Sequence, residues 1–221
     1  GFAERAEFWL VLWVCGGLSI VGSILRLFQD PTGLVLFTTP RVFGTIGVEV
    51  CLMIAFVPFL RAQGWRLGDM TESFQILDIL RGIALWIGAY ALYWLTFIVA
   101  RAIGPAAVAL VTSTRFRGQI PIVVVAIGSV INPIFEEFFY FGYTFNALRR
   151  HSIKAAVAVA VLLRVAIHVY QGWLALVFIA PLAILYTFYF MRTHRIWPVI
   201  VAHAIQDFVA LAALSTQATS Q

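Results

Sequence analysis

Long apolar runs separated by short polar stretches follow one another along the chain. Each run approaches the ~20 residues that an α-helix needs to cross the hydrocarbon core of a bilayer. The pattern predicts seven membrane-spanning helices, at Phe8–Phe28, Val42–Leu60, Gly82–Ala100, Ile120–Leu148, Lys154–Tyr170, Trp173–Met191 and Ile196–Leu214. We therefore expect an all-α fold, a polytopic transmembrane helical bundle of about seven spans, with residues 1–221 forming a single integral membrane domain.

One stretch, Arg61–Asp78, stays polar for longer than the others. Trp65, Leu67 and Phe74 are spaced among its charged residues. Such a mixture suits a segment that lies along the membrane surface, with its apolar side chains at the boundary between headgroups and acyl chains. We therefore predict an interfacial segment over residues 61–78.

The composition supports a membrane protein. Of the 221 residues, 62% are hydrophobic and 11% are charged, and the mean hydropathy is +0.95. A soluble domain carries about a quarter charged residues, so this surface is not built mainly for water. The net charge of +5 comes from Lys and Arg that sit mostly in short loops, where anionic lipid headgroups account for them. Membrane lipids are therefore expected partners, and nucleic acid is not.

The basic residues are also unevenly divided between the two predicted sides of the membrane. The side of the N-terminus, with the loops at Arg61–Arg81 and Arg149–Lys154, carries nine Lys and Arg, whereas the other side, with the loop at Arg101–Arg117, carries five. The positive-inside rule then places the N-terminus in the cytoplasm. We expect the membrane to be a bacterial plasma membrane.

Seven ionisable residues stand out at bilayer depth in the predicted spans. They are Glu49, Glu136, Glu137, Arg164, His168, His203 and Asp207. Each costs ~2.5–3.5 kcal/mol on insertion scales, so each is expected to face the bundle interior and to have a partner or a function. Glu49 stands alone in the first half of the chain. It is interpreted either as the partner of an arginine on another span or as a functional residue.

All of the other ionisable residues except Glu137 belong to groups spaced by four, which places each group on one helix face. The groups are Asn132 with Glu136 and Tyr140, Arg164 with His168, and His203 with Asp207. Their depths along the predicted spans are compatible, so they can meet in one buried layer. Two carboxylates and two imidazoles there can activate water, with a Glu as general base and a His pair that stabilises the oxyanion.

Several of these residues also have a purely structural interpretation. His168 can be an interfacial residue near the end of its span, and the pair His203 and Asp207 can be a polar contact between helices. Arg164 can serve only as a counter-ion. The adjacent carboxylates Glu136 and Glu137 are harder to explain in this way, because two buried carboxylates are a poor structural device.

Three motifs at these residues resemble the CPBP family, the CAAX-protease and bacteriocin-processing (Abi-type) intramembrane proteases. Members carry E-E-x-x-x-R, then F-x-x-x-H, then H-x-x-x-N or H-x-x-x-D on successive helices. This chain has EEFFYFG at Glu136–Gly142, RVAIH at Arg164–His168 and HAIQD at His203–Asp207. The GWRLG at Gly64–Gly68 is also similar. The resemblance runs from Gly64 to the end and is densest over the motif-bearing core, residues 120–208.

The resemblance implies an intramembrane endopeptidase that hydrolyses a peptide bond at membrane depth in a lipidated or membrane-embedded protein. It implies that Glu136 activates the water with support from Glu137, that His168 and His203 bind the water or the oxyanion, and that Asp207 orients His203. Arg164, Asn132 and Tyr140 would be supporting residues. The family has been viewed both as zinc enzymes and as metal-free glutamate proteases. We expect no metal or other cofactor, because no H-E-x-x-H motif is present.

The chain departs from the family pattern at two motif positions. Phe141 stands where members have Arg, and Arg164 stands where they have Phe. One interpretation is a reciprocal swap that supplies the same guanidinium to the carboxylates from the neighbouring helix. The alternative is a catalytically inactive scaffold, or a subunit of a larger membrane complex that binds partner transmembrane helices. A proton or ion carrier is disfavoured, because the sequence shows no inverted repeat of broken helices.

Overall fold

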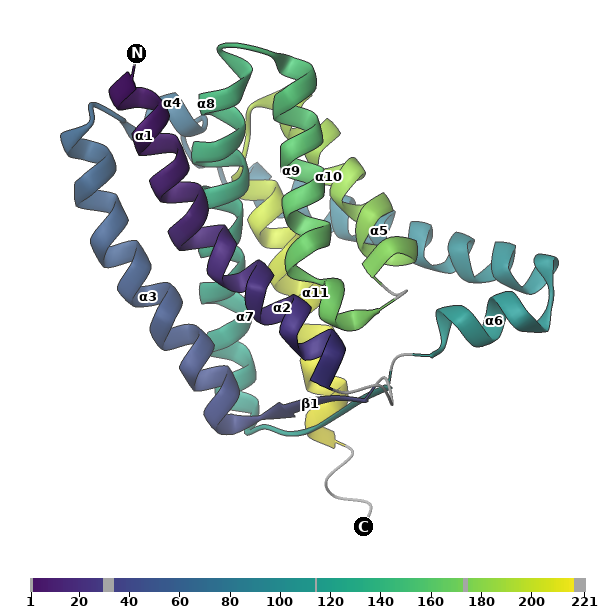
Figure 1. Ribbon diagram of the computed structural model, residues 1–221. Coiled ribbons are helices and arrows are strands. Elements are labelled where there is room, and N and C mark those ends of the chain that lie inside the picture. Colours follow the sequence, from purple (N-terminus) through teal and green to yellow (C-terminus); the bar gives the residue numbers. More distant parts are fainter. Residues whose placement is uncertain (1, 30–33, 114, 173–174, 217–221) are drawn as a thin grey trace. The chain divides into compact units, whose positions relative to one another are not determined.

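The computed structural model describes residues 2–29, 34–113, 115–172 and 175–216 (Figure 1). The chain divides into two compact units. The first unit comprises Gly1–Leu34, Ala89–Arg115 and Phe139–Thr193, and the second unit comprises Val35–Gly88, Phe116–Phe138 and His194–Gln221. The prediction of a single domain stays a prediction.

Helices make up most of both units. The second unit holds α3 (Thr39–Ala62), α4 (Leu67–Met70), α7 (Ile122–Glu137) and α11 (Trp197–Thr216). The first unit holds α1 (Phe2–Val11), α2 (Leu18–Gln29), α6 (Pro105–Val111), α8 (Asn146–Arg149), α9 (Ile153–Ile167) and α10 (Ala180–Thr193). Short π-helical or 3₁₀ segments lie at Leu12–Gly17, Phe138–Phe145, Val169–Gln171 and Ala175–Ile179, and α5 (Leu77–Ile103) contributes to both units.

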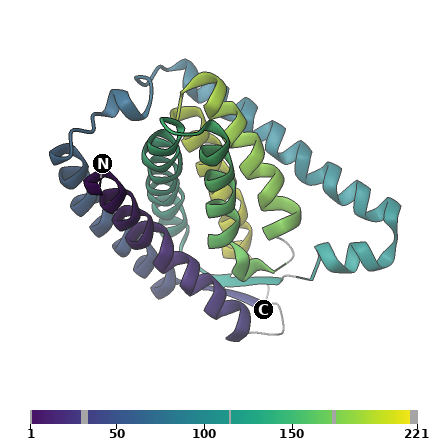
Figure 2. The same cartoon turned by 45° about the horizontal axis from the view of Figure 1, so that its top comes forward.

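In the second unit, α7 packs against both α3 and α11 (Figure 2). Ile120, Val124 and Val125 form a buried apolar cluster at the start of α7. Gly82 on α5 allows a close approach to α11, since a Cβ atom at this position would lie 2.5 Å from the Cβ of Val201. Small residues at helix contacts are typical of membrane proteins, where close packing drives association.

In the first unit, α9 packs against α2, α8 and α10. Ala156 and Ala160 on α9 are fully buried, so this helix also uses small side chains where others approach it. Tyr143 donates a hydrogen bond of 3.0 Å to Glu7 and thereby ties the π-helical segment after α7 to α1. The first unit is thus held by apolar packing with a few polar contacts.

Four helical stretches within the described residues are long and apolar enough to cross a membrane: Ala6–Phe28, Thr39–Ala62, Leu77–Ile103 and Ile122–Arg149. They correspond to the first four predicted spans. Large apolar side chains such as Trp13, Ile54 and Ile103 are 61%, 69% and 74% exposed, which suits a lipid environment better than water. The protein is a polytopic, all-α integral membrane protein, as the sequence predicts.

The last three predicted spans correspond to shorter helices. They are α9 and the apolar helices Val177–Thr193 and Trp197–Ala213. A helix of 17 residues is about 26 Å long, slightly less than the hydrocarbon core. The predicted fifth span is too long because α9 ends at Ile167 and a 3₁₀ turn follows. Trp173 and Leu174, at the start of the predicted sixth span, lie outside the described residues.

A two-stranded sheet of β1 (Leu34–Thr38) and β2 (Arg115–Gln119) joins two stretches that the sequence pattern left between spans. Gly118 permits the close contact, because a Cβ atom there would lie 2.7 Å from the Phe37 carbonyl oxygen. The rings of Phe37 and Phe116 pack 6.0 Å apart. The all-α prediction therefore misses one short ribbon, since pairing between residues about 80 positions apart leaves no local periodicity.

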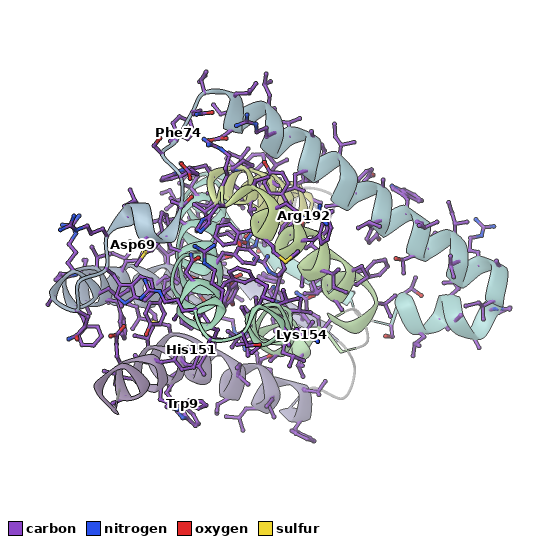
Figure 3. All side chains as sticks on the ribbon, turned by 90° about the horizontal axis from the view of Figure 1, so that it is seen from above. Trp9, Asp69, Phe74, His151, Lys154 and Arg192 are labelled. Atoms are coloured by element: carbon purple, nitrogen blue, oxygen red, sulfur yellow. The ribbon has the colours of Figure 1, made fainter. Side chains whose placement is uncertain are left out.

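The polar stretch 61–78 is mostly non-helical. Apart from its ends, which belong to α3 and α5, only α4 is helical, and Leu67, Phe74 and Ile76 are 54%, 51% and 76% exposed. Figure 3 shows Asp69 and Phe74 on this segment. Exposed apolar side chains beside exposed charges suit a membrane surface. The interfacial location remains a prediction.

One buried carboxylate, Asp78, fastens this segment to the chain before α11. Its two oxygens accept hydrogen bonds from Arg195 at 2.8 and 2.7 Å and from Arg81 at 2.9 Å. The Asp78 side chain is fully buried, and Arg195 also donates to the carbonyl of Ser73. Nearby, Thr71 accepts a hydrogen bond from the backbone N–H of Ile196. These contacts fix where α11 begins.

Replacing Asp78 by Ala should therefore destabilise the protein more than any exposed substitution in this segment. The change leaves the Arg195 guanidinium largely buried without its carboxylate, which costs about 3 kcal/mol in free energy of unfolding. Thermal unfolding in detergent measures the loss. Asp69→Ala is the matched control, because exposed Asp69 accepts one hydrogen bond, from the backbone of Arg66, and should cost about 1 kcal/mol. Equal melting temperatures for the two variants would contradict the role of Asp78.

Candidate active site

Three polar side chains of the second unit project from the last turns of α7. Asn132 precedes Pro133, and Glu136 and Glu137 follow it. Proline supplies no backbone N–H, so the carbonyl of Ser129 loses its usual helical partner at this point. After Glu137 the helix widens into the π-helical segment Phe138–Phe145, a feature that is frequent at functional sites. Glu136 and Glu137 are 8% and 0% exposed.

His203 on α11 lies against both carboxylates. A hydrogen bond of 2.6 Å joins its Nδ1 atom to Oε1 of Glu137. Its Nε2 atom lies 4.0 Å from Oε2 of Glu136 and 3.5 Å from Oδ1 of Asp207. The His203 side chain is 5% exposed, whereas that of Asp207 is 26% exposed. The two ring nitrogens therefore have different surroundings.

The contact with Glu137 determines which ring nitrogen of His203 faces the other carboxylates. When Glu137 is ionised, its carboxylate can only accept, and the Nδ1–H of His203 donates to it. Nε2 is then the nitrogen that faces Glu136 and Asp207, and in the imidazolium form it donates as well. The resemblance assigned the orienting role to Asp207. In the structure the shorter contact with the ring comes from Glu137 instead.

Glu49 on α3 is also part of this cluster. It is 6% exposed, and its Oε1 atom accepts a hydrogen bond of 2.7 Å from Nδ2 of Asn132. The same Nδ2 atom donates to Oε1 of Glu136 at 3.2 Å. The sequence pattern left the role of Glu49 open between structure and function. In the sequence, the only unusual feature of Glu49 was a carboxylate at membrane depth. None of the hydrogen bonds that the structure describes for Glu49 involves an arginine.

The remaining candidate residues, Tyr140, Arg164 and His168, belong to the first unit. The Arg164 guanidinium lies among aromatic rings, 5.3 Å from the ring centroid of Tyr140, 5.7 Å from that of Phe141 and 5.3 Å from that of Tyr186. Arg164 is 1% exposed. We name this arrangement the Arg164 cage, consisting of Arg164, Tyr140, Phe141 and Tyr186.

His168 follows α9 directly and is half-buried. Its Nδ1 atom lies 2.7 Å from the backbone oxygen of Arg164, so the Nδ1–H donates and Nε2 is left for other partners. Its ring stacks on that of Tyr170 at 6.3 Å. The predicted spacing of four between Arg164 and His168 thus brings the two residues into contact, through a backbone oxygen of Arg164.

Metal ligation has specific geometric requirements. Among the described residues, no group of three His, Cys, Asp or Glu side chains has an arrangement that could hold a metal ion. The expectation of a metal-free site stays a prediction.

Comparison with known proteins gives one match. Residues 118–209 match the family model described as type II CAAX prenyl endopeptidase Rce1-like. No curated protein and no solved structure matches the chain. The matched segment contains all three sequence motifs and nearly coincides with the predicted core, residues 120–208. Residues 118–209 of this integral membrane protein are therefore similar to the Rce1-like family of type II CAAX prenyl endopeptidases.

Proposed function

We propose that this protein is an intramembrane endopeptidase in which Glu136 activates the hydrolytic water. One observation carries the proposal: within the family-matched segment, the buried Glu136 carboxylate has one oxygen held by Asn132 and the other 4.0 Å from Nε2 of His203. Such a separation is too long for a direct hydrogen bond and suits a water molecule that contacts both atoms. The water would then lie between a base and an imidazole.

The chemistry follows from these positions. Glu136 takes a proton from the water as its oxygen attacks the carbonyl carbon of the scissile peptide bond. The charge that develops on the carbonyl oxygen is stabilised by the Nε2–H of the His203 imidazolium, which Glu137 orients through Nδ1. As the carbon–nitrogen bond breaks, the protonated Glu136 gives its proton to the leaving amine. The resemblance implies that His168 also binds the water or the oxyanion, and this role stays a prediction.

The proposed substrate is the C-terminal region of a lipidated protein. The matched family model names prenyl endopeptidases, and a site at the membrane-embedded end of α7 suits a peptide bond that a lipid anchor holds in the bilayer. The test uses the full chain in phospholipid vesicles with a farnesylated peptide that carries three residues after the modified cysteine. We expect mass spectrometry to detect the released tripeptide. A chain that cleaves neither this peptide nor geranylgeranylated or acylated ones would favour the non-catalytic scaffold.

Orientation forms a separate part of the proposal, since the basic loops favour a cytoplasmic N-terminus. The turn between α8 and α9, with His151, and the start of α9, with Lys154, should then face the cytoplasm (Figure 3). In a variant without Cys15 and Cys51, the cysteine introduced by His151→Cys should react with a membrane-impermeant maleimide only after the cells are permeabilised. Ser113→Cys, an exposed position in the loop predicted on the other side, should react in intact cells. The reverse pattern would show that the orientation is wrong.

A further inference from the structure

Glu49 contributes a carboxyl group to the site from a helix that none of the three motifs includes. It lies outside the family-matched residues 118–209, on α3. Its neighbour Val48 is 58% exposed, so α3 otherwise presents apolar side chains outward at this level, whereas Glu49 itself is buried against α7. A carboxyl group at membrane depth is costly unless it has a partner or a task. The identity of its partner indicates the task.

That partner is the side-chain amide of Asn132. An amide nitrogen carries two N–H groups, so Asn132 can donate to Glu49 and to Glu136 at the same time without competition. The bond to Glu49 is 2.7 Å long and that to Glu136 is 3.2 Å long. Because the shorter bond is the stronger one, Glu49 fixes the rotamer of Asn132. Asn132 then holds Oε1 of Glu136 in a defined direction.

This arrangement distinguishes the two oxygens of Glu136. Oε1 is occupied by Asn132, whereas Oε2 is buried and accepts no hydrogen bond from any residue that the structure describes. Oε2 is also the oxygen that lies 4.0 Å from Nε2 of His203. We propose that Glu49 is a positioning residue of the active site: it anchors Asn132, and Asn132 directs Oε2 of Glu136 toward the reacting water. This inference rests on the proposed proteolytic function.

A contact that only joined α3 to α7 would have different consequences. Polar side chains often stabilise helix pairs in membranes, and losing such a contact lowers the melting temperature without a specific effect on the chemical step. Loss of a positioning contact lowers kcat and leaves KM nearly unchanged, since the substrate still binds. The separation of kcat from KM therefore distinguishes the two roles.

The experiment compares Glu49→Gln with Glu49→Met in the full chain in vesicles. Gln keeps an oxygen that accepts from Asn132, whereas Met has a similar volume and no such acceptor. Glu49→Met should lower kcat by about 10- to 100-fold, as is usual for residues that orient a catalytic group, with KM within about twofold. Glu49→Gln should keep most of the wild-type kcat. Glu7→Leu, which removes the acceptor of the Tyr143 hydrogen bond in the first unit, should leave kcat unchanged.

Two results would overturn the inference: a Glu49→Met variant with wild-type kcat, or a Glu49→Gln variant as impaired as Glu49→Met. If Glu49→Met does not fold, Asn132→Asp replaces the donating amide without a change in volume. It should then reduce kcat to a similar extent, and adding Glu49→Gln should reduce it no further. An inactive wild-type protein, or full activity in Glu136→Gln, would instead overturn the proposed function and this inference with it.

Discussion

Replacing Glu136 by Gln should abolish peptide cleavage while the protein stays folded. Gln has the same size as Glu, and its side-chain oxygen can still accept the hydrogen bond that Asn132 donates to Glu136. It cannot take a proton from water, so the step that creates the nucleophile is lost. General bases contribute about 10²- to 10⁴-fold to rates, and we expect kcat to fall by about 10³-fold or more.

Single-turnover cleavage of a farnesylated peptide, followed by mass spectrometry, measures this loss, and a thermal melt confirms that folding is retained. Glu137→Gln should have a smaller effect, because Glu137 acts through the His203 ring and the Gln oxygen can still accept from Nδ1. Glu72→Gln, at an exposed position, serves as the matched control. A Glu136→Gln variant that keeps more than about a third of wild-type kcat would exclude Glu136 as the base.

Contacts within one helix were predictable from spacing alone. Asn132 and Glu136 are four residues apart and hydrogen-bonded, and His203 and Asp207 are four apart with 3.5 Å between Nε2 and Oδ1. A helix places residues i and i+4 on one face, so no tertiary information is needed for either pair. The first four spans were predictable for a related reason, because the length of an apolar run relates directly to membrane thickness.

Contacts between helices were not predictable in this way. The hydrogen bond from His203 to Glu137 and that from Asn132 to Glu49 each join residues more than 60 positions apart. Periodicity shows which face of a helix is polar, but it does not show which other helix meets that face. Glu49 was therefore recognised as unusual without a partner being assigned. The resemblance offered no help there, since its motifs lie elsewhere in the chain.

Phe141 and Arg164 were noticed through comparison with the family motifs and not through helical spacing. Each departs from the family pattern, and the sequence left open whether the two departures compensate or mark an inactive scaffold. In the first unit the Arg164 guanidinium lies 5.7 Å from the ring centroid of Phe141, the residue at the position where the family has its arginine. Phe141 is fully buried and stacks on Phe190 at 5.1 Å. The two side chains thus share one buried space, and the delivery of the guanidinium to the carboxylates stays a prediction.

A double-mutant cycle on this pair should accordingly show strong favourable coupling. Arg164→Phe removes the cation from the Arg164 cage, and Phe141→Arg adds a second cation to it, so each single variant should be less stable and at least about tenfold less active. A buried cation over aromatic rings contributes about 2 kcal/mol or more, and a second like charge beside it is unfavourable. The double variant, with one cation and one Phe again in the shared space, should regain a coupling of about 1–3 kcal/mol.

Cleavage rates and melting temperatures of the four proteins measure this coupling. Arg192→Phe is the matched control, because Figure 3 shows Arg192 on α10, and its guanidinium lies 4.5 Å from the Phe188 ring centroid at an exposed position. This change should have little effect on either quantity, since exposed cation–π contacts contribute about 0.5–1 kcal/mol at most. If the double variant is no better than the poorer single variant, Phe141 and Arg164 do not compensate each other. If Arg164→Phe alone keeps wild-type kcat while Glu136→Gln is inactive, catalysis does not need the guanidinium.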